Sequence, residues 1–196
     1  LFMTIYGEQG DEIAFRLYDH QTNEEVDLPC ATVLSFVTNE VLGTLFEPQV
    51  FNFTNPTVDH VKSLGVGWNW YSTYIELSDI DGLAMLDEQR GDNAESINSQ
   101  TSFTMYYGDY GWYGSLSSIN NESIYRLKMI YPTSITMTGM KADPLAHPIT
   151  VTKGLNHIGF IAPVALDVNS AFANLNATPG DIVKNQSKYA QYYDGY

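Results

Sequence analysis

Gly65-Val66-Gly67-Trp68-Asn69-Trp70-Tyr71-Ser72 is the stretch that decides the fold, because much of its pattern returns later in the chain as Gly154-Leu155-Asn156-His157-Ile158-Gly159. Three further matches lie 86 or 87 residues apart: Gln100 with Gln186, Tyr106-Tyr107 with Tyr192-Tyr193, and Asn69 with Asn156. A spacing that is held over some forty residues, with one change of about one residue, indicates a duplicated module.

The fold class expected from this pattern is mainly β. Residues 1–58 alternate between apolar and polar positions with turn residues between them, which predicts an incomplete all-β domain that resembles a β-sandwich. Two related small α+β repeat modules follow, at residues 59–152 and 153–196. The second is expected to be truncated, and the chain to be part of a longer polypeptide that supplies adjacent domains.

Hydrophobic periodicity predicts the elements of the first module. The predicted elements are a strand Val66–Glu76, a helix Leu77–Gln89 with Ser78 or Asp79 as its N-cap, and strands at Ser96–Tyr107, 111–116, Ser123–Tyr131 and Ser134–Thr138. In the second module, Asp167–Asn174 repeats the helical spacing after a strand at His157–Ala162.

Charge and cysteine content exclude several classes of function. The net charge is −14, from 9 basic and 23 acidic residues, so the basic footprint of a nucleic-acid-binding protein is missing. The same charge argues against docking on an anionic membrane surface, and no apolar run approaches the ~20 residues that span a bilayer. The single cysteine, Cys30, excludes an internal disulfide framework.

Motifs for metal binding or catalysis are weak. The four histidines form no i, i+4 pair, and no G-x-S-x-G motif occurs. Asp79-Ile80-Asp81-Gly82 resembles a fragment of a calcium loop, but it lacks the third acid and the trailing Glu of an EF-hand. Structural calcium at Asp79 and Asp81 stays open beside a simpler interpretation, an acidic helix start. No other cofactor is expected, and we expect the chain to be non-catalytic.

Aromatic residues near two strand starts are the best functional candidates: Trp68, Trp70, Tyr107, Tyr110, Trp112 and Tyr113. Trp and Tyr join an apolar ring to a polar tip, which suits shallow recognition of sugars or protein surfaces. The alternative is that some of these residues, Trp70 and Trp112 above all, only pack inside the module. His157, which falls near the position of Trp70 in the second copy, is also expected to fill a packing position.

Two parts of the chain resemble modular surface or secreted proteins of Bacteroidota-type bacteria. The first is Phe2–Asp19 with Val41-Leu42-Gly43-Thr44 and Glu47-Pro48, which is similar to the back half of a β-domain in those proteins. The second runs through Gly67–Ser72, Gly111–Leu116 and Tyr125–Lys128, and it is similar to their Asn-Trp-containing tandem repeat. The resemblance implies export to the cell surface, in association with the outer membrane, and an adhesive or ligand-binding context.

These observations leave three functions open. The first is a non-catalytic extracellular adhesion or carbohydrate-binding module whose partner is a glycan or a protein surface. The second is a structural spacer, in which tandem modules carry a functional tip away from the cell. The third is the ancillary region of an exported glycoside hydrolase or other hydrolase.

Overall fold

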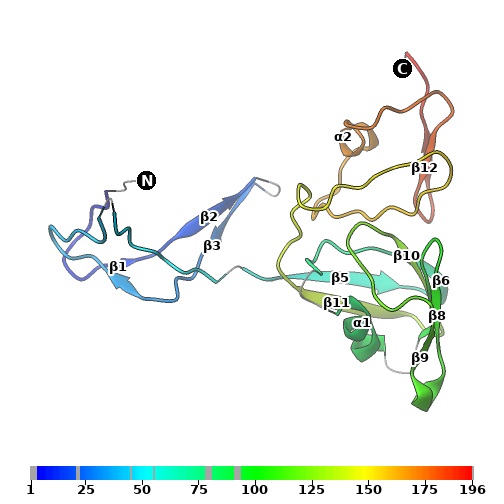
Figure 1. Ribbon diagram of the computed structural model, residues 1–196, viewed down its shortest axis with the longest axis horizontal. Helices are drawn as coiled ribbons and strands as arrows, with labels where there is room; N and C mark the ends of the chain where they lie inside the picture. The colour runs from blue at the N-terminus through cyan, green and yellow to red at the C-terminus, as the bar shows by residue number, and fades with distance from the viewer. Residues whose placement is uncertain are drawn as a thin grey trace. The chain divides into compact units, whose positions relative to one another are not determined.

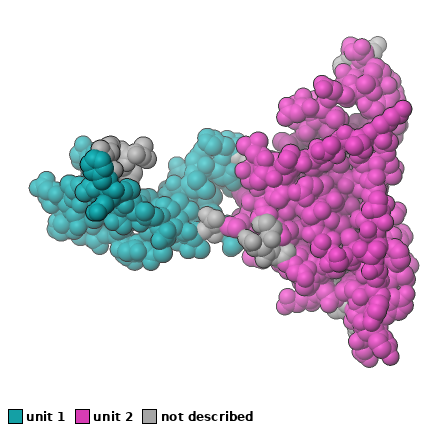
Figure 2. Space-filling model, viewed as in Figure 1, with its two compact units in different colours: residues 1–57 teal, residues 58–196 magenta. Residues whose placement is uncertain are grey.

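The computed structural model describes residues 4–20, 23–44, 46–54, 56–77, 81–90 and 94–195. The chain divides into two compact units, Leu1–Thr57 and Val58–Tyr196 (Figure 2). Strands greatly outnumber helices in both, which confirms the mainly β class. The second unit takes in residues of both predicted repeat modules, 59–152 and 153–196, so the two copies share one compact body.

The first unit is built from short antiparallel pairs. β1 (Glu12–Ile13) pairs with β4 (Leu34–Ser35), and β2 (Arg16–Asp19) forms a hairpin with β3 (Glu24–Asp27). Phe15 packs against Phe51 and Phe53, with ring centroids 5.6 and 5.0 Å apart. No residue of this unit is fully buried within its described ranges, so this small aromatic cluster stands where a larger domain would have a core.

The second unit contains a five-stranded antiparallel sheet and a long two-stranded one (Figure 1). The larger sheet has the order β6 (Gly67–Tyr71), β10 (Tyr125–Met129), β7 (Ala94–Asn98), β8 (Phe103–Tyr106) and β9 (Trp112–Gly114). The smaller one pairs β5 (Val58–Leu64) with β11 (Thr133–Gly139), and the helix α1 (Gly82–Arg90) lies beside β11.

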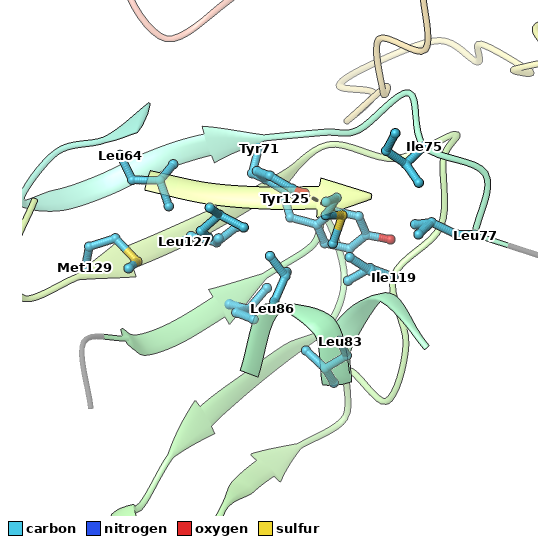
Figure 3. Packing of buried hydrophobic residues seen from close by; sticks show 13 residues of the cluster. Leu64, Tyr71, Ile75, Leu77, Leu83, Leu86, Ile119, Tyr125, Leu127 and Met129 are labelled. Carbon is cyan, nitrogen blue, oxygen red and sulfur yellow. Dashed lines mark hydrogen bonds between the residues drawn. The ribbon is translucent and has the colours of Figure 1, made fainter. Parts of the chain in front are cut away.

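Buried and exposed side chains alternate along the strands, and the buried ones form the core of this unit. Tyr125, Leu127 and Met129 occupy every second position of β10 and are at most 3 % exposed, as period-2 geometry requires for one face of a sheet. Ile135 and Met137 do the same on β11, and α1 adds Leu83 and Leu86 (Figure 3). Burying such side chains stabilises the fold by roughly 2 kcal/mol each.

Three predicted elements in the first module need correction. The strand predicted at Val66–Glu76 is β6, which ends at Tyr71. The helix begins at Gly82, not at Leu77, because the carboxylate of Asp81 accepts the backbone N–H groups of Leu83 and Ala84 and caps it. The predicted caps Ser78 and Asp79 lie outside the described residues. The predicted strand Ser96–Tyr107 is a hairpin, because the Ser99 side chain bonds around a turn to Ser102 and splits it into β7 and β8.

The second copy keeps a helix followed by a hairpin, but the strand predicted at His157–Ala162 is wrong, because this segment pairs with the first copy only through an isolated bridge between Ile158 and Ser123. α2 (Val168–Ala171) is capped by Asp167, and β12 (Ile182–Lys184) forms a hairpin with β13 (Tyr189–Gln191). A turn closed by Asn185, which accepts the N–H of Lys188, joins these two strands. Within the described residues, neither helix is long and apolar enough to cross a bilayer.

The same asparagine-centred turn opens both copies. Asn69 Oδ1 accepts the N–H of Gly65, and its Nδ2 donates to the carbonyl oxygens of Gly65 and Gly67. Asn156, 87 residues later, makes the corresponding bonds to the residues four and two positions before it. Gly67 (φ +83°) and Gly154 (φ +110°) provide the positive φ that the turn needs. The sequence repeat is therefore a repeat of hydrogen-bonded local structure.

Candidate functional site

Three of the six aromatic candidates meet at the tip of the β8–β9 hairpin. Tyr107, Tyr110 and Tyr113 line an open hollow of about 400 Å³ and are 54, 79 and 58 % exposed. The rings of Tyr107 and Tyr113 stand edge to face with centroids 6.1 Å apart. A short 3-10 turn, Gly108–Tyr110, brings the three together, and we call them the tyrosine tip. Its apolar ring faces and phenol groups are open to a ligand.

Trp112 lies beside the tyrosine tip in sequence but points to the other side of the sheet. Its indole Nε1 donates to Asp87 of α1 at 2.8 Å, and its ring meets Tyr106 edge to face at 5.5 Å. It also packs against the buried cluster. Trp112 thus connects α1 to the sheet. Its position agrees with the alternative that this residue packs inside the module and does not bind a ligand.

Trp68 and Trp70 lie on the outer face of the sheet, and each carries a cation over its ring. The Arg126 guanidinium is 5.4 Å from the Trp68 ring centroid, and the Lys184 ammonium is 5.9 Å from that of Trp70. Trp68 is 43 % exposed, whereas Trp70 is half-buried. Because Lys184 belongs to the second copy, this part of the face is assembled from both copies.

Two glutamines join the copies reciprocally. Gln186 of the second copy accepts the N–H of Trp70 (2.8 Å) and donates to the carbonyl of Trp68 (3.0 Å). Gln100 of the first copy makes the same two bonds to His157 and Leu155, both at 2.7 Å. Both glutamines sit in the turn of an equivalent hairpin. Through its glutamine, each copy therefore binds the segment that opens the other copy, which is the strand β6 in the first copy and the irregular segment 155–157 in the second.

A cavity of about 210 Å³ lies at this junction, lined by residues that include Gln100, Glu122, Asn156 and His157. The Nδ1 atom of His157 is buried and has no hydrogen-bond partner in the described structure. Desolvation lowers the pKa of His157, and the charges of Arg126 and Lys184 lower it further. Both effects favour the neutral imidazole of His157, which fills a half-buried position beside two cations.

The described residues provide no set of ligands for the calcium ion considered at Asp79 and Asp81. Asp81 uses its carboxylate as the cap of α1, while Asp79 lies outside the described residues. Across the ranges that the structure describes, no three His, Cys, Asp or Glu side chains converge as metal ligands. The acidic helix start explains Asp81 through its bonds to the first-turn N–H groups.

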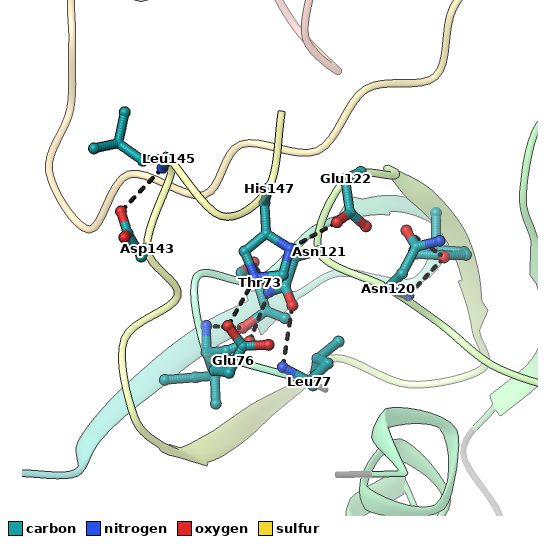
Figure 4. A network of polar contacts seen from close by, with 11 residues as sticks. Thr73, Glu76, Leu77, Asn120, Asn121, Glu122, Asp143, Leu145 and His147 are labelled. Carbon is teal, nitrogen blue, oxygen red and sulfur yellow. Dashed lines mark hydrogen bonds and ion pairs between the residues drawn. The ribbon is translucent and has the colours of Figure 1, made fainter. Parts of the chain in front are cut away.

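A charged cluster that sequence spacing does not reveal holds the segment between the copies. His147 donates through Nε2 to Glu76 (2.7 Å) and through Nδ1 to Glu122 (2.6 Å), and its side chain is 14 % exposed (Figure 4). The bonds to Glu76 and Glu122 raise the pKa of His147. Next to it, the buried Asn121 donates to the carbonyls of Thr73 and Ile75. The cluster fixes the segment around His147, which leads into the second copy, to Glu76 and Glu122 of the first copy.

This cluster predicts that stability falls as pH rises. A histidine whose folded pKa is raised contributes fully below its unfolded value of about 6.5, and the contribution is lost as pH passes the folded pKa, because only the imidazolium can donate to both carboxylates. We expect His147→Gln to cost roughly 1–2 kcal/mol at pH 6 and less at pH 9. Urea unfolding of both proteins at the two pH values measures this.

Glu122→Gln is the matched control, since it removes one carboxylate and keeps the imidazole. It should reduce the pH dependence without abolishing it, because Glu76 still accepts from Nε2. A His147→Gln cost that is equal at pH 6 and pH 9 would contradict the charged form of the cluster.

Sequence reasoning located the aromatic residues but missed their polar neighbours. The only signal for the glutamines was their spacing of 86 residues, which marked the repeat and gave no sign of a contact. Nothing in the local sequence around Arg126, Lys184 or His147 marks them, because their partners are distant in the chain. Comparison of the chain with protein-family models, curated proteins and solved structures found no match.

Proposed function

We propose that this chain is a non-catalytic, extracellular module of a surface protein that binds carbohydrate through the tyrosine tip. The observation that carries the proposal is the convergence of Tyr107, Tyr110 and Tyr113 around one open hollow. Exposed large rings of this kind are costly to leave in water without a partner, and a contiguous group of them marks an interaction site.

The chemistry of the hollow favours a sugar. A tyrosine ring offers an apolar face to the C–H groups of a pyranose, and its hydroxyl can donate to or accept from the sugar hydroxyls. The hollow is shallow and open, which suits a chain or a surface glycan better than a small molecule that must be enclosed. The net charge of −14 keeps such a module soluble and separate from other acidic surfaces.

A structural spacer is the second candidate, and the reciprocal glutamine contacts favour it. They fix two copies of one module against each other, as a rod of tandem repeats requires. A spacer needs no exposed aromatic cluster, so ligand binding separates the two candidates.

Screening the protein against an immobilised glycan panel tests the proposal. We expect binding that falls at least tenfold in Tyr110→Ala, about 1.4 kcal/mol, because the most exposed ring of the hollow is lost. Tyr110→Phe should keep most of the affinity, since it retains the ring and loses only a hydroxyl.

Tyr189→Ala is the matched control, because Tyr189 is 75 % exposed on β13 and lies outside the hollow. It should bind like the parent protein. Failure of the parent protein to bind any glycan would remove the proposal and leave the spacer. Equal loss of binding in Tyr110→Ala and Tyr189→Ala would remove the tyrosine tip as the site.

A further inference from the structure

Strand register arranges the outer face of the five-stranded sheet into rows. One row crosses all five strands through residues that are direct cross-strand partners: Trp68, Lys128, Ser96, Met105 and Tyr113. With strands about 4.8 Å apart, it extends for roughly 19 Å. Tyr113, at one end, belongs to the tyrosine tip, and Trp68 stands at the other end. This row is therefore a strip that has an aromatic ring at each end and, in its middle, the buried Ser96.

Basic residues gather at the tryptophan end of this strip. The protein has nine lysines and arginines in all, and three of them lie here: Lys128 in the row, with Arg126 and Lys184 beside it. Lys128 is paired with Glu95 at 2.5 Å. Arg126 and Lys184 are exposed and have no acidic partner at ion-pair distance among the described side chains. On a chain of net charge −14, two such cations next to indole rings are a local concentration of positive charge.

We propose that the outer sheet face binds an extended carboxylated polysaccharide, with uronic-acid carboxylates on Arg126 and Lys184 and sugar rings along the strip from Trp68 to Tyr113. This inference rests on the proposed function, because it adds a second contact region and a ligand class to the tyrosine tip. The guanidinium of Arg126 can bind a carboxylate with two parallel hydrogen bonds, while Lys184 offers a point charge.

Charge density favours this ligand over other polyanions. Double-stranded DNA carries one negative charge per ~1.7 Å, and long-range repulsion from a protein of charge −14 opposes its approach. A uronic-acid chain has a single carboxylate on each sugar, so two local cations can pair with it while the rest of the sugar contacts the rings. Because Arg126 and Lys184 lie together at the tryptophan end, the carboxylates are expected to bind there and the neutral parts of the chain toward Tyr113.

Calorimetric titration with polygalacturonate oligosaccharides tests the proposal, with the methyl-esterified oligosaccharides as the uncharged counterpart. We expect the acid form to bind the parent protein at least tenfold more tightly than the ester. The double variant Arg126→Gln, Lys184→Gln should bind the acid form at least tenfold more weakly and the ester unchanged. Lys62→Gln, on β5 away from this sheet, removes one positive charge elsewhere on the surface and should not alter binding.

The outcomes separate this proposal from the proposed function. If neutral glycans bind through Tyr110 but the double variant binds polygalacturonate as the parent does, the acidic-ligand inference is wrong and the proposed function stands. If the parent binds no glycan of either kind, both are wrong. Tighter binding of a sulfated heparin oligosaccharide than of polygalacturonate, with the same dependence on Arg126 and Lys184, would overturn the assignment to carboxylates.

Discussion

Asn69→Ala is expected to lower the free energy of unfolding by about 2–3 kcal/mol. The Asn69 side chain is 7 % exposed and makes three bonds within its own turn, to the N–H of Gly65 and to the carbonyls of Gly65 and Gly67. Alanine leaves these backbone groups without their partner at the point where β6 enters the sheet. Urea unfolding followed by tryptophan fluorescence measures the loss.

The second copy supplies the control for this prediction. Asn156 makes the same bonds in a half-exposed turn, where water can replace the lost amide, so Asn156→Ala should cost about 1 kcal/mol or less. Asn69→Asp should not rescue stability, because a carboxylate can accept from Gly65 but repels the two carbonyl oxygens. Equal costs for Asn69→Ala and Asn156→Ala would show that burial of the turn does not matter.

The sequence identified the repeat of this segment, but it predicted a strand at Val66–Glu76 and not the turn. The residues of the turn interact within five positions of the chain, so the pattern Gly-x-Asn with its spacing of 87 residues contains the whole local structure. The alternation of β10 and β11 was readable, because a strand with one buried face must alternate. Local sequence patterns therefore predicted the repeat, the mainly β class and the two helices.

The predicted boundaries of helices and strands were wrong where several neighbouring residues suit the same structural position. Ser78, Asp79 and Asp81 are all acceptable N-caps, and only packing of α1 against the core selects Asp81. The polar run Asn98-Ser99-Gln100-Thr101-Ser102 fits an exposed strand as well as a turn, so the β7–β8 hairpin was predicted as one strand. Propensity alone does not separate such cases.

The site was only half predictable, because the side of a sheet on which a residue lies depends on register. Trp112 and Tyr113 are neighbours, yet Trp112 reaches Asp87 near the core while Tyr113 joins the exposed tyrosine tip. A shift of one residue would exchange them. The cations over Trp68 and Trp70 come from β10 and β12, far along the chain, and only the folded arrangement brings them there.

Replacing either glutamine of the junction should free the backbone groups that it binds and leave those bound by the other glutamine paired. β6 is an edge strand of the five-stranded sheet, and Gln186 occupies the outward N–H of Trp70 and the outward carbonyl of Trp68. Such unpaired edge groups are sites of unwanted strand pairing unless they are covered. In Gln186→Ala, we expect the Trp70 amide to exchange hydrogen at least tenfold faster, with the His157 amide unchanged.

Gln100→Ala should give the converse result: the His157 amide should exchange hydrogen faster, and the exchange rate of the Trp70 amide should not change. Each variant is therefore the control of the other. Both glutamines are exposed, and each single variant should cost about 1 kcal/mol. The double variant should cost about 2 kcal/mol, because both glutamine pairs are lost, while the backbone bonds of Gly159 to Glu122 and of Ile124 to His157 still join the copies. Faster exchange at both amides in either single variant would contradict the prediction. It would mean that the two glutamine contacts open together, as one cooperative unit.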